Sequence, residues 1–150
     1  MIVEAVAALA PGIEVRDKVN RPAVRVPREH LRAVARQLHD DPSLAFDLLL
    51  DHTAVDWLAE GSFELLYALY STTHGHSLFV TVVVPRDDPT VPTVSDVWPT
   101  AHWQEREAYD LLGILYDDHP DLRRLFLEDD WQGFPLRKDY HDDDMLELPQ

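Results

Sequence analysis

The stretch FELLYALYSTTHGHSLFVTVVV, residues 63–84, carries the clearest strand pattern of the chain. Apolar residues recur at every second position in two runs, as expected of strands that bury one face. These runs are Phe63, Leu65, Tyr67 and Leu69, then Leu78, Val80, Val82 and Val84. A polar link with His74-Gly75-His76 separates the runs, so we predict an antiparallel hairpin.

Upstream of the hairpin, apolar spacing predicts three further strands and two helices. One strand is expected from the alternation at residues 44–50, and two short strands at 13–15 and 24–26 flank a turn. Helical spacing occurs in two sets: Ile2, Val3, Val6 and Leu9, then Leu31, Val34, Ala35 and Leu38. The order helix, two strands, helix, three strands predicts a two-layer α+β domain with a mostly antiparallel, mixed sheet.

Downstream of the hairpin, prolines at 85, 89, 92 and 99 indicate a connector over the surface. A helix is then expected from about Trp98 to Leu112, with Thr100 as its N-cap and Gly113 as its terminator. We place the domain at residues 1–113 and an extended, charged arm at 114–150. Residues 105–150 hold 14 acidic and 5 basic residues, yet they include several large apolar side chains. We therefore expect the arm to be ordered against its own domain or a neighbouring protein.

Composition excludes several classes of function. The 150 residues include no cysteine, which rules out disulfides, cysteine-ligated iron–sulfur clusters and a cysteine nucleophile in this sequence. A formal net charge of −15 argues against direct binding to nucleic acid or to an anionic membrane surface. We expect neither a signal peptide nor a membrane span, because residues 1–9 lack a basic leader and the run at 78–84 is too short.

The helix near residue 105 contains the acids that could do chemistry. Glu105 falls on the apolar face of the helical wheel, so it must be protonated or paired with a cation. Arg106 and Asp110 are expected to pair on the opposite, outer face. Glu107 is two residues from Glu105 and points away from it, so a pair of catalytic carboxylates is disfavoured. Eight histidines match no metal-ligand spacing, and a phosphate or dinucleotide motif is absent from the sequence.

Three blocks of the C-terminal third resemble one family: WQEREAYDLLGI at 103–114, HPDLRRL at 119–125 and DWQGFPLRKDY at 130–140. The blocks DHTAVDW at 51–57 and VPRDDPTVPT at 84–93 are also similar to it. The family is the C-type, 30 kDa subunit of respiratory complex I, the proton-translocating NADH:quinone oxidoreductase. In this chain Tyr116-Asp117-Asp118 replaces the aromatic residue and glycine that we expect shortly before His119.

The resemblance implies an Nqo5-like α+β fold and a non-catalytic, structural role in the peripheral arm of the complex, at the cytoplasmic face of the membrane. It implies that the arm docks on the D-type subunit, which forms the quinone site with the B-type subunit. NADH, FMN, iron–sulfur clusters and quinone would belong to partner subunits, and contact with the membrane would be indirect. The motif residues expected at the interface between subunits or in its supporting structure are Glu105, Arg106, Glu107, Asp110, His119, Pro120, Arg123, Arg124, Trp131, Gly133, Pro135, Arg137, Lys138, Asp139 and Tyr140.

Two alternatives stay open. One is the equivalent subunit of a membrane-bound, energy-converting hydrogenase, because the same module occurs there. The other belongs to a different class, a stand-alone metal-dependent hydrolase, and it is suggested by the histidines and acids alone.

Overall fold

The computed structural model describes residues 2–16 and 20–142. In chain order its elements are α1 (Ile2–Ala7), β1 (Glu14–Val15), β2 (Ala23–Arg25), α2 (Leu31–Asp40), β3 (Leu48–Trp57), β4 (Ser62–Ser71), β5 (His76–Pro85), β6 (Thr90–Pro92), α3 (Ala101–Leu112) and β7 (Leu115–Asp117), with short 3₁₀ turns at Arg28–His30 and Leu58–Glu60. The predicted α+β class is confirmed.

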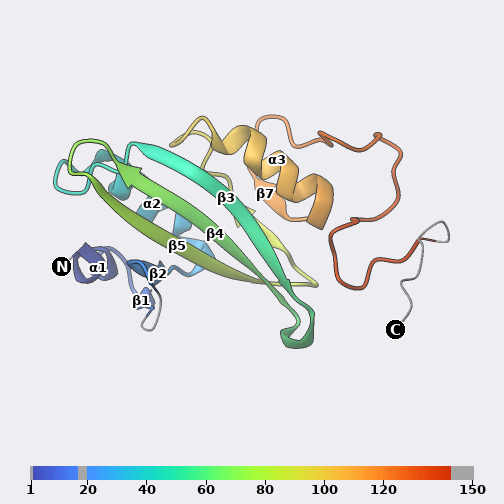
Figure 1. Cartoon of the computed structure of the whole chain (residues 1–150), viewed down its shortest axis with the longest axis horizontal. Coiled ribbons are helices and arrows are strands. Elements are labelled where there is room, and N and C mark those ends of the chain that lie inside the picture. Colours follow the sequence, from blue (N-terminus) through green and yellow to red (C-terminus); the bar gives the residue numbers. More distant parts are fainter. Residues whose placement is uncertain (1, 17–19, 143–150) are drawn as a thin grey trace.

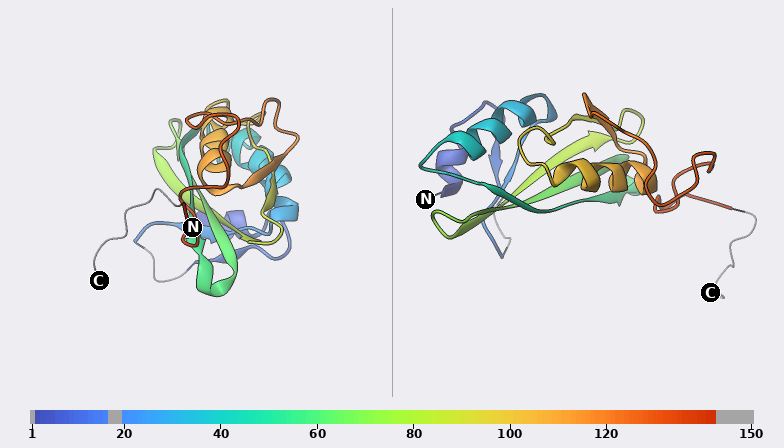
Figure 2. Two further views of the ribbon diagram at one scale, coloured as in Figure 1. Left: turned by 90° about the vertical axis from the view of Figure 1, so that its right-hand side faces the viewer. Right: turned by 90° about the horizontal axis from the view of Figure 1, so that it is seen from above.

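Five strands form one sheet in the order β1-β2-β5-β4-β3 (Figure 1). The β4–β5 hairpin is antiparallel as predicted, and so are the pairs β1–β2 and β3–β4, whereas β2 runs parallel to β5. Helices α2 and α3 lie on the same face of this sheet, which gives two layers (Figure 2). Phe63, Leu65 and Leu69 from β4 lie in the resulting core, each at most 1% exposed.

The prediction of a strand at residues 44–50 is wrong in where the strand begins and in which of its side chains face the core. The strand β3 begins at Leu48 and continues to Trp57, and a bulge near Leu50 breaks its register with β4. Leu48 and Leu50 are 42% and 58% exposed, whereas Leu44 and Phe46 are buried in the loop before the strand. The mismatch arises before the strand begins, because residues 41–47 form a loop in which Ala45 has φ +47°, and the chain enters β3 with Leu49 facing the core. The bulge then shifts the facing again, so that the next buried residue is His52.

A histidine of β3 faces the core because it has hydrogen-bond partners there. The ring of His52 is buried, and burial lowers its pKa to about 4, so the ring is neutral. Its Nδ1 donates to the Leu66 carbonyl at 3.0 Å, and its Nε2 accepts from the Tyr116 hydroxyl at 2.6 Å. Tyr116 belongs to β7, which pairs in parallel with β6 in a second, two-stranded sheet that the sequence did not predict.

Helix α3 ends as predicted but begins differently. Gly113 adopts φ +77° and its N–H bonds the Tyr109 carbonyl at 2.8 Å, as expected of a left-handed terminator. Thr100 does not cap the helix with its side chain, because its hydroxyl donates instead to the Leu49 carbonyl of β3. The helix is thereby tied to the edge of the sheet.

We predict that Asp118→Gly raises the free energy of unfolding by about 0.5–1 kcal/mol. Asp118 has φ +65°, in the left-handed region that glycine adopts without strain, and its exposed ion pair with Arg32 at 3.6 Å contributes little. Asp118→Ala should lower stability, because alanine tolerates this region less well than aspartate does. Chemical denaturation of the three proteins tests whether stability falls in the order glycine variant, wild type, alanine variant. An alanine variant more stable than the other two proteins would contradict the prediction.

Candidate functional site

The charged residues of the C-terminal blocks gather at the end of α3, where the arm folds back on the domain. Asp110 lies at their centre and has no exposed surface. One carboxylate oxygen accepts the backbone N–H groups of Leu125, Phe126 and Leu127 at 3.2, 2.6 and 3.1 Å. The other accepts from Arg124 at 3.1 Å. Three consecutive amides and a guanidinium therefore hold the arm on this one side chain.

Asp110 stays ionised in this setting. Burial by itself would raise the pKa of Asp110, but hydrogen bonds from the Phe126 and Leu127 amides and from Arg124 outweigh it and lower the pKa. Charge-assisted bonds of this kind are about twice as strong as neutral ones. Both oxygens of the carboxylate thus have hydrogen-bond donors from residues 124–127, so Asp110 anchors the arm to α3.

Arg124 extends the anchor along the arm. Its guanidinium also donates to the carbonyls of Asp110, Trp131 and Gly133, at 2.8, 3.0 and 2.9 Å. The same group lies 5.1 Å from the centre of the Phe134 ring, within the range of a cation–π contact. One side chain therefore links α3 with three later points of the chain.

Arg106 does not pair with Asp110, so the predicted pair on the outer face of the helix is wrong. Arg106 is 4% exposed and donates to the carbonyls of Arg123 and Arg124, at 3.2 and 3.1 Å. Its guanidinium also lies 4.9 Å from the Trp103 ring centre. The arm covers the face of α3 that the sequence pattern assigned to solvent.

A second attachment holds residues 134–139. Arg137 donates to the Leu112 carbonyl at 2.7 Å and lies between the rings of Phe63 and Phe134, at 5.2 and 4.9 Å. Gly113 makes this approach possible, since a Cβ there would lie 2.6 Å from the Arg137 guanidinium and 2.7 Å from the Phe134 ring.

Asp56 and Arg86 complete the second attachment. Arg86 bridges the buried Asp56 at 3.0 Å and Asp139 at 2.7 Å, while Asp56 also accepts the Lys138 N–H at 2.9 Å. The sequence pattern missed both residues as contacts of the arm, because 53 or more positions separate them from Lys138 and Asp139. The one sign of their role in the sequence is that Asp56 and Arg86 lie in the two upstream blocks that resemble the family.

The other motif residues support turns or remain at the surface. His119 donates from Nε2 to the His102 carbonyl, Gly133 has φ +83° and packs against the Tyr140 ring, and the Tyr140 hydroxyl donates to Asp142. Arg123 bonds Asp121 at the surface, Pro120 borders a shallow pocket, and Pro135 is partly buried. Glu107 is exposed on α3, as its place on the helical wheel predicted.

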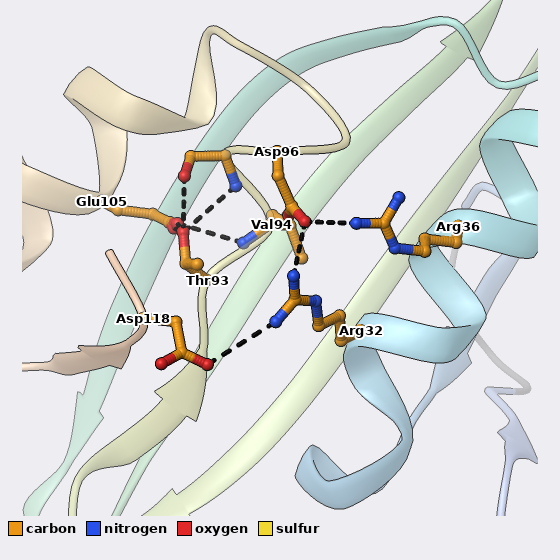
Figure 3. Close-up of polar contacts among 8 residues, drawn as sticks. Arg32, Arg36, Thr93, Val94, Asp96, Glu105 and Asp118 are labelled. Atoms are coloured by element: carbon orange, nitrogen blue, oxygen red, sulfur yellow. Dashed lines mark hydrogen bonds and ion pairs between the residues drawn. The ribbon is translucent and has the colours of Figure 1, made fainter. Parts of the chain in front are cut away.

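Glu105 is buried without a cationic partner among the described residues, so the protonated alternative holds. Its carboxyl group bonds the Thr93 hydroxyl at 2.5 Å and accepts the Val94 N–H at 3.2 Å (Figure 3). Burial raises the pKa of Glu105 to about 8, against the lowering effect of these bonds and with a further increase from Asp96. Asp96 of the same loop binds Arg32 and Arg36 of α2, so the loop connects the two helices (Figure 3).

Within the described residues, the structure shows neither a cluster of metal ligands nor a helix that could span a membrane. The described ranges contain no group of three or more His, Asp or Glu side chains that could hold a metal ion. Across these same ranges, none of the helices has the length and apolar character needed to cross a bilayer.

We predict that Glu105→Gln makes stability less dependent on pH. The pKa of Glu105 is 4.5 in its ordinary, unfolded setting and about 8 in the folded chain. Between these two pH values, the folded chain keeps a proton on Glu105 that the unfolded chain releases. Wild-type stability should therefore fall as pH rises through this window, by at most about 1.4 kcal/mol per unit. Glutamine keeps the bonds without ionising, so the variant should be more stable than wild type at pH 8. Denaturation from pH 5 to 8 tests this, and an unchanged pH slope would contradict it.

We predict that Asp110→Asn destabilises the chain by about 3 kcal/mol, because Arg124 and three amides lose their charged acceptor. The arm should detach first, so limited proteolysis should cut between residues 124 and 138 before the sheet unfolds. Glu107→Gln is the matched control on the same helix and should change stability by less than about 0.5 kcal/mol. Equal effects of the two substitutions would rule out the anchor.

Comparisons with known proteins agree with this architecture. A family model described as the respiratory-chain NADH dehydrogenase 30 kDa subunit matches residues 24–145. The C-type subunit of NADH-quinone oxidoreductase from Streptomyces coelicolor is 47% identical over 117 residues, which are 77% of this chain and 47% of that protein. The protein of the same name from Geotalea uraniireducens is 43% identical over 129 residues, or 85% of this chain and 77% of that one. The chain thus spans about half the length of several of its relatives.

Two solved structures share the fold. A chain of the membrane-bound sulfane sulfur reductase, an archaeal respiratory membrane complex, matches 93% of this chain and 84% of its own, with 31% identity and a TM-score of 0.78. A trypsin-resistant fragment of Nqo5 matches 81% of this chain and 96% of its own, with 33% identity and a TM-score of 0.65. The sequence blocks, the fold and these relatives together show that the chain belongs to the family of the 30 kDa, C-type subunit of respiratory-chain NADH dehydrogenase.

Proposed function

We propose that the chain is a non-catalytic, structural subunit of the peripheral arm of a proton-translocating NADH:quinone oxidoreductase. The observation that carries this proposal is the folded arm, whose arginines Arg124 and Arg137 bond inside the chain and whose large apolar side chains face outward. Phe126, Leu136 and Trp131 are 65%, 59% and 36% exposed. Aromatic side chains held outward on an ordered segment are typical of anchors for a partner protein.

The partners proposed for this surface are the D-type subunit of the quinone site, and the B-type subunit beside it. Arg106 of α3 and the partly buried Arg124 and Arg137 of the arm bind carbonyl groups of this chain, so they shape the arm. Contact with the D-type subunit would then fall to exposed residues such as Phe126, Trp131 and Lys138. The motif residues divide into those that fold the arm and those available to a partner.

Redox cofactors are assigned to other subunits in this proposal. The sequence has no cysteine to ligate a cluster, and the polar groups of the anchor have partners within the chain. NADH, FMN, iron–sulfur clusters and quinone would therefore act elsewhere in the complex. The proposed location is the cytoplasmic face of the membrane, with attachment through the other subunits.

A second candidate is the corresponding subunit of another membrane-bound respiratory complex, such as an energy-converting hydrogenase. The likeness to a chain of the sulfane sulfur reductase favours this candidate, because a related module serves a different electron-transfer complex there. No observation on the described residues favours the metal-dependent hydrolase, given their lack of a ligand cluster.

Purification of the tagged full chain from its native host tests the proposal. We expect oxidoreductase subunits to copurify with the wild-type chain, and the recovery to fall several-fold with Asp110→Asn, which frees the arm. Glu60→Gln, an exposed carboxylate outside the arm, is the control and should leave recovery unchanged. Recovery of no such subunit would refute the structural role, and a nickel-containing hydrogenase subunit in place of NADH-binding subunits would favour the second candidate.

A further inference from the structure

A groove runs between the free edge of the sheet and one face of α3. Strand β3 is the last strand of the sheet, and within the described residues β4 is the one strand that pairs with it. Helix α3 lies along this edge (Figure 1), to which Thr100 ties its start through the Leu49 carbonyl. The space between the two elements has a volume of about 260 Å³.

The residues that line the groove show its direction. Four consecutive residues of β3, numbers 51–54, contribute to it. Because successive side chains of a strand point to opposite faces, four in a row can touch one cavity only along the edge of the strand. The helix contributes residues spaced as one helical face: Gln104, Glu107, Ala108, Leu111 and Leu112. Leu136 of the arm lies at the groove as well.

This arrangement suits an added strand. Alternate N–H and C=O groups of an edge strand point away from its neighbour and can pair with another extended chain. A groove bounded by an edge strand and a helix supplies both main-chain pairing and pockets for alternate side chains.

Charge identifies the kind of segment that fits. Asp51 and Glu107 are exposed acids on the two sides of the groove, whereas Ala108, Leu111 and Leu112 give an apolar wall. A complementary segment alternates apolar residues with lysine or arginine. The chain's own residues 143–150 include Asp143, Asp144 and Glu147, and a second copy carries a net charge of −15, so both match poorly.

We propose that an extended, basic segment of a partner subunit binds in this groove and adds a sixth strand to the sheet at β3. This inference rests on the proposed function and specifies one of its contacts. It assigns the β3 edge to the assembled complex, next to Leu136 of the arm, which lines the groove.

Amide hydrogen exchange on the full chain, alone and in the copurified complex, tests the added strand. We expect the amides of residues 51–54 that point away from β4 to exchange at least about tenfold more slowly in the complex, since main-chain pairing removes their contact with water. The exposed turn at Leu58–Glu60 should exchange at the same rate in both samples. Equal rates at 51–54 in the two samples would overturn the inference. Protection of these outward-pointing amides in the isolated chain would also overturn it. Constant protection would indicate the chain's own C-terminal segment, and protection that rises with concentration would indicate a second copy.

A charge reversal tests the basic character of the segment. Glu107→Lys should lower recovery of the partner about tenfold, because it places like charges together at the groove. Glu60→Lys makes the same change of charge at an exposed site outside the groove and should leave recovery unchanged. Equal recovery with both variants would refute the basic segment while leaving the proposed function in place. If the wild-type chain recovers no oxidoreductase subunit, the proposed function fails and this inference fails with it.

Discussion

The carboxylate of Asp110 is the constraint on which the arm depends. A buried ion must be surrounded by donors, and here three consecutive amides and one guanidinium supply them. Once Arg124 is fixed in this way, its remaining N–H groups select the carbonyls of Trp131 and Gly133. The chain that follows then reaches Gly113, where the absence of a side chain admits Phe134 and Arg137. An extended segment with few apolar contacts thus gains a defined path from a short series of polar contacts.

Local patterns predicted the elements whose structure is determined locally. The hairpin of β4 and β5 follows from strict alternation on both sides of a glycine turn, and the end of α3 follows from Gly113. The same reasoning misplaced β3, because Leu44 and Phe46 are buried from a loop, and the strand that follows exposes Leu48 and Leu50. It also missed the pairing of β6 with β7, since short parallel strands depend on contacts between distant segments. Alternation indicates that a face is buried but not what covers it.

The candidate site was predictable in its residues but not in its contacts. The resemblance identified Asp110, Arg124 and Arg137, whereas the helical wheel placed Arg106 toward solvent and paired it with Asp110. The wheel fails there because the arm buries that face of α3, and nothing in the local sequence shows this. Glu105 shows the opposite case, because the helical wheel predicted its burial correctly. The wheel left open whether Glu105 is protonated or paired with a cation, and its neighbours in the structure, Thr93 and Val94, are uncharged donors, which favours the protonated state.

We infer that residues 114–142 of the arm are ordered within the isolated chain, before any partner binds. Hydrogen exchange of the backbone amides of Leu125, Phe126 and Leu127 in the isolated wild-type chain tests it most directly, because these amides bond to Asp110. We predict that the three amides exchange as slowly as the paired amides of β3, the strand packed beside α3. Exchange at the rate of an unstructured peptide, with protection appearing only after a partner is added, would contradict it.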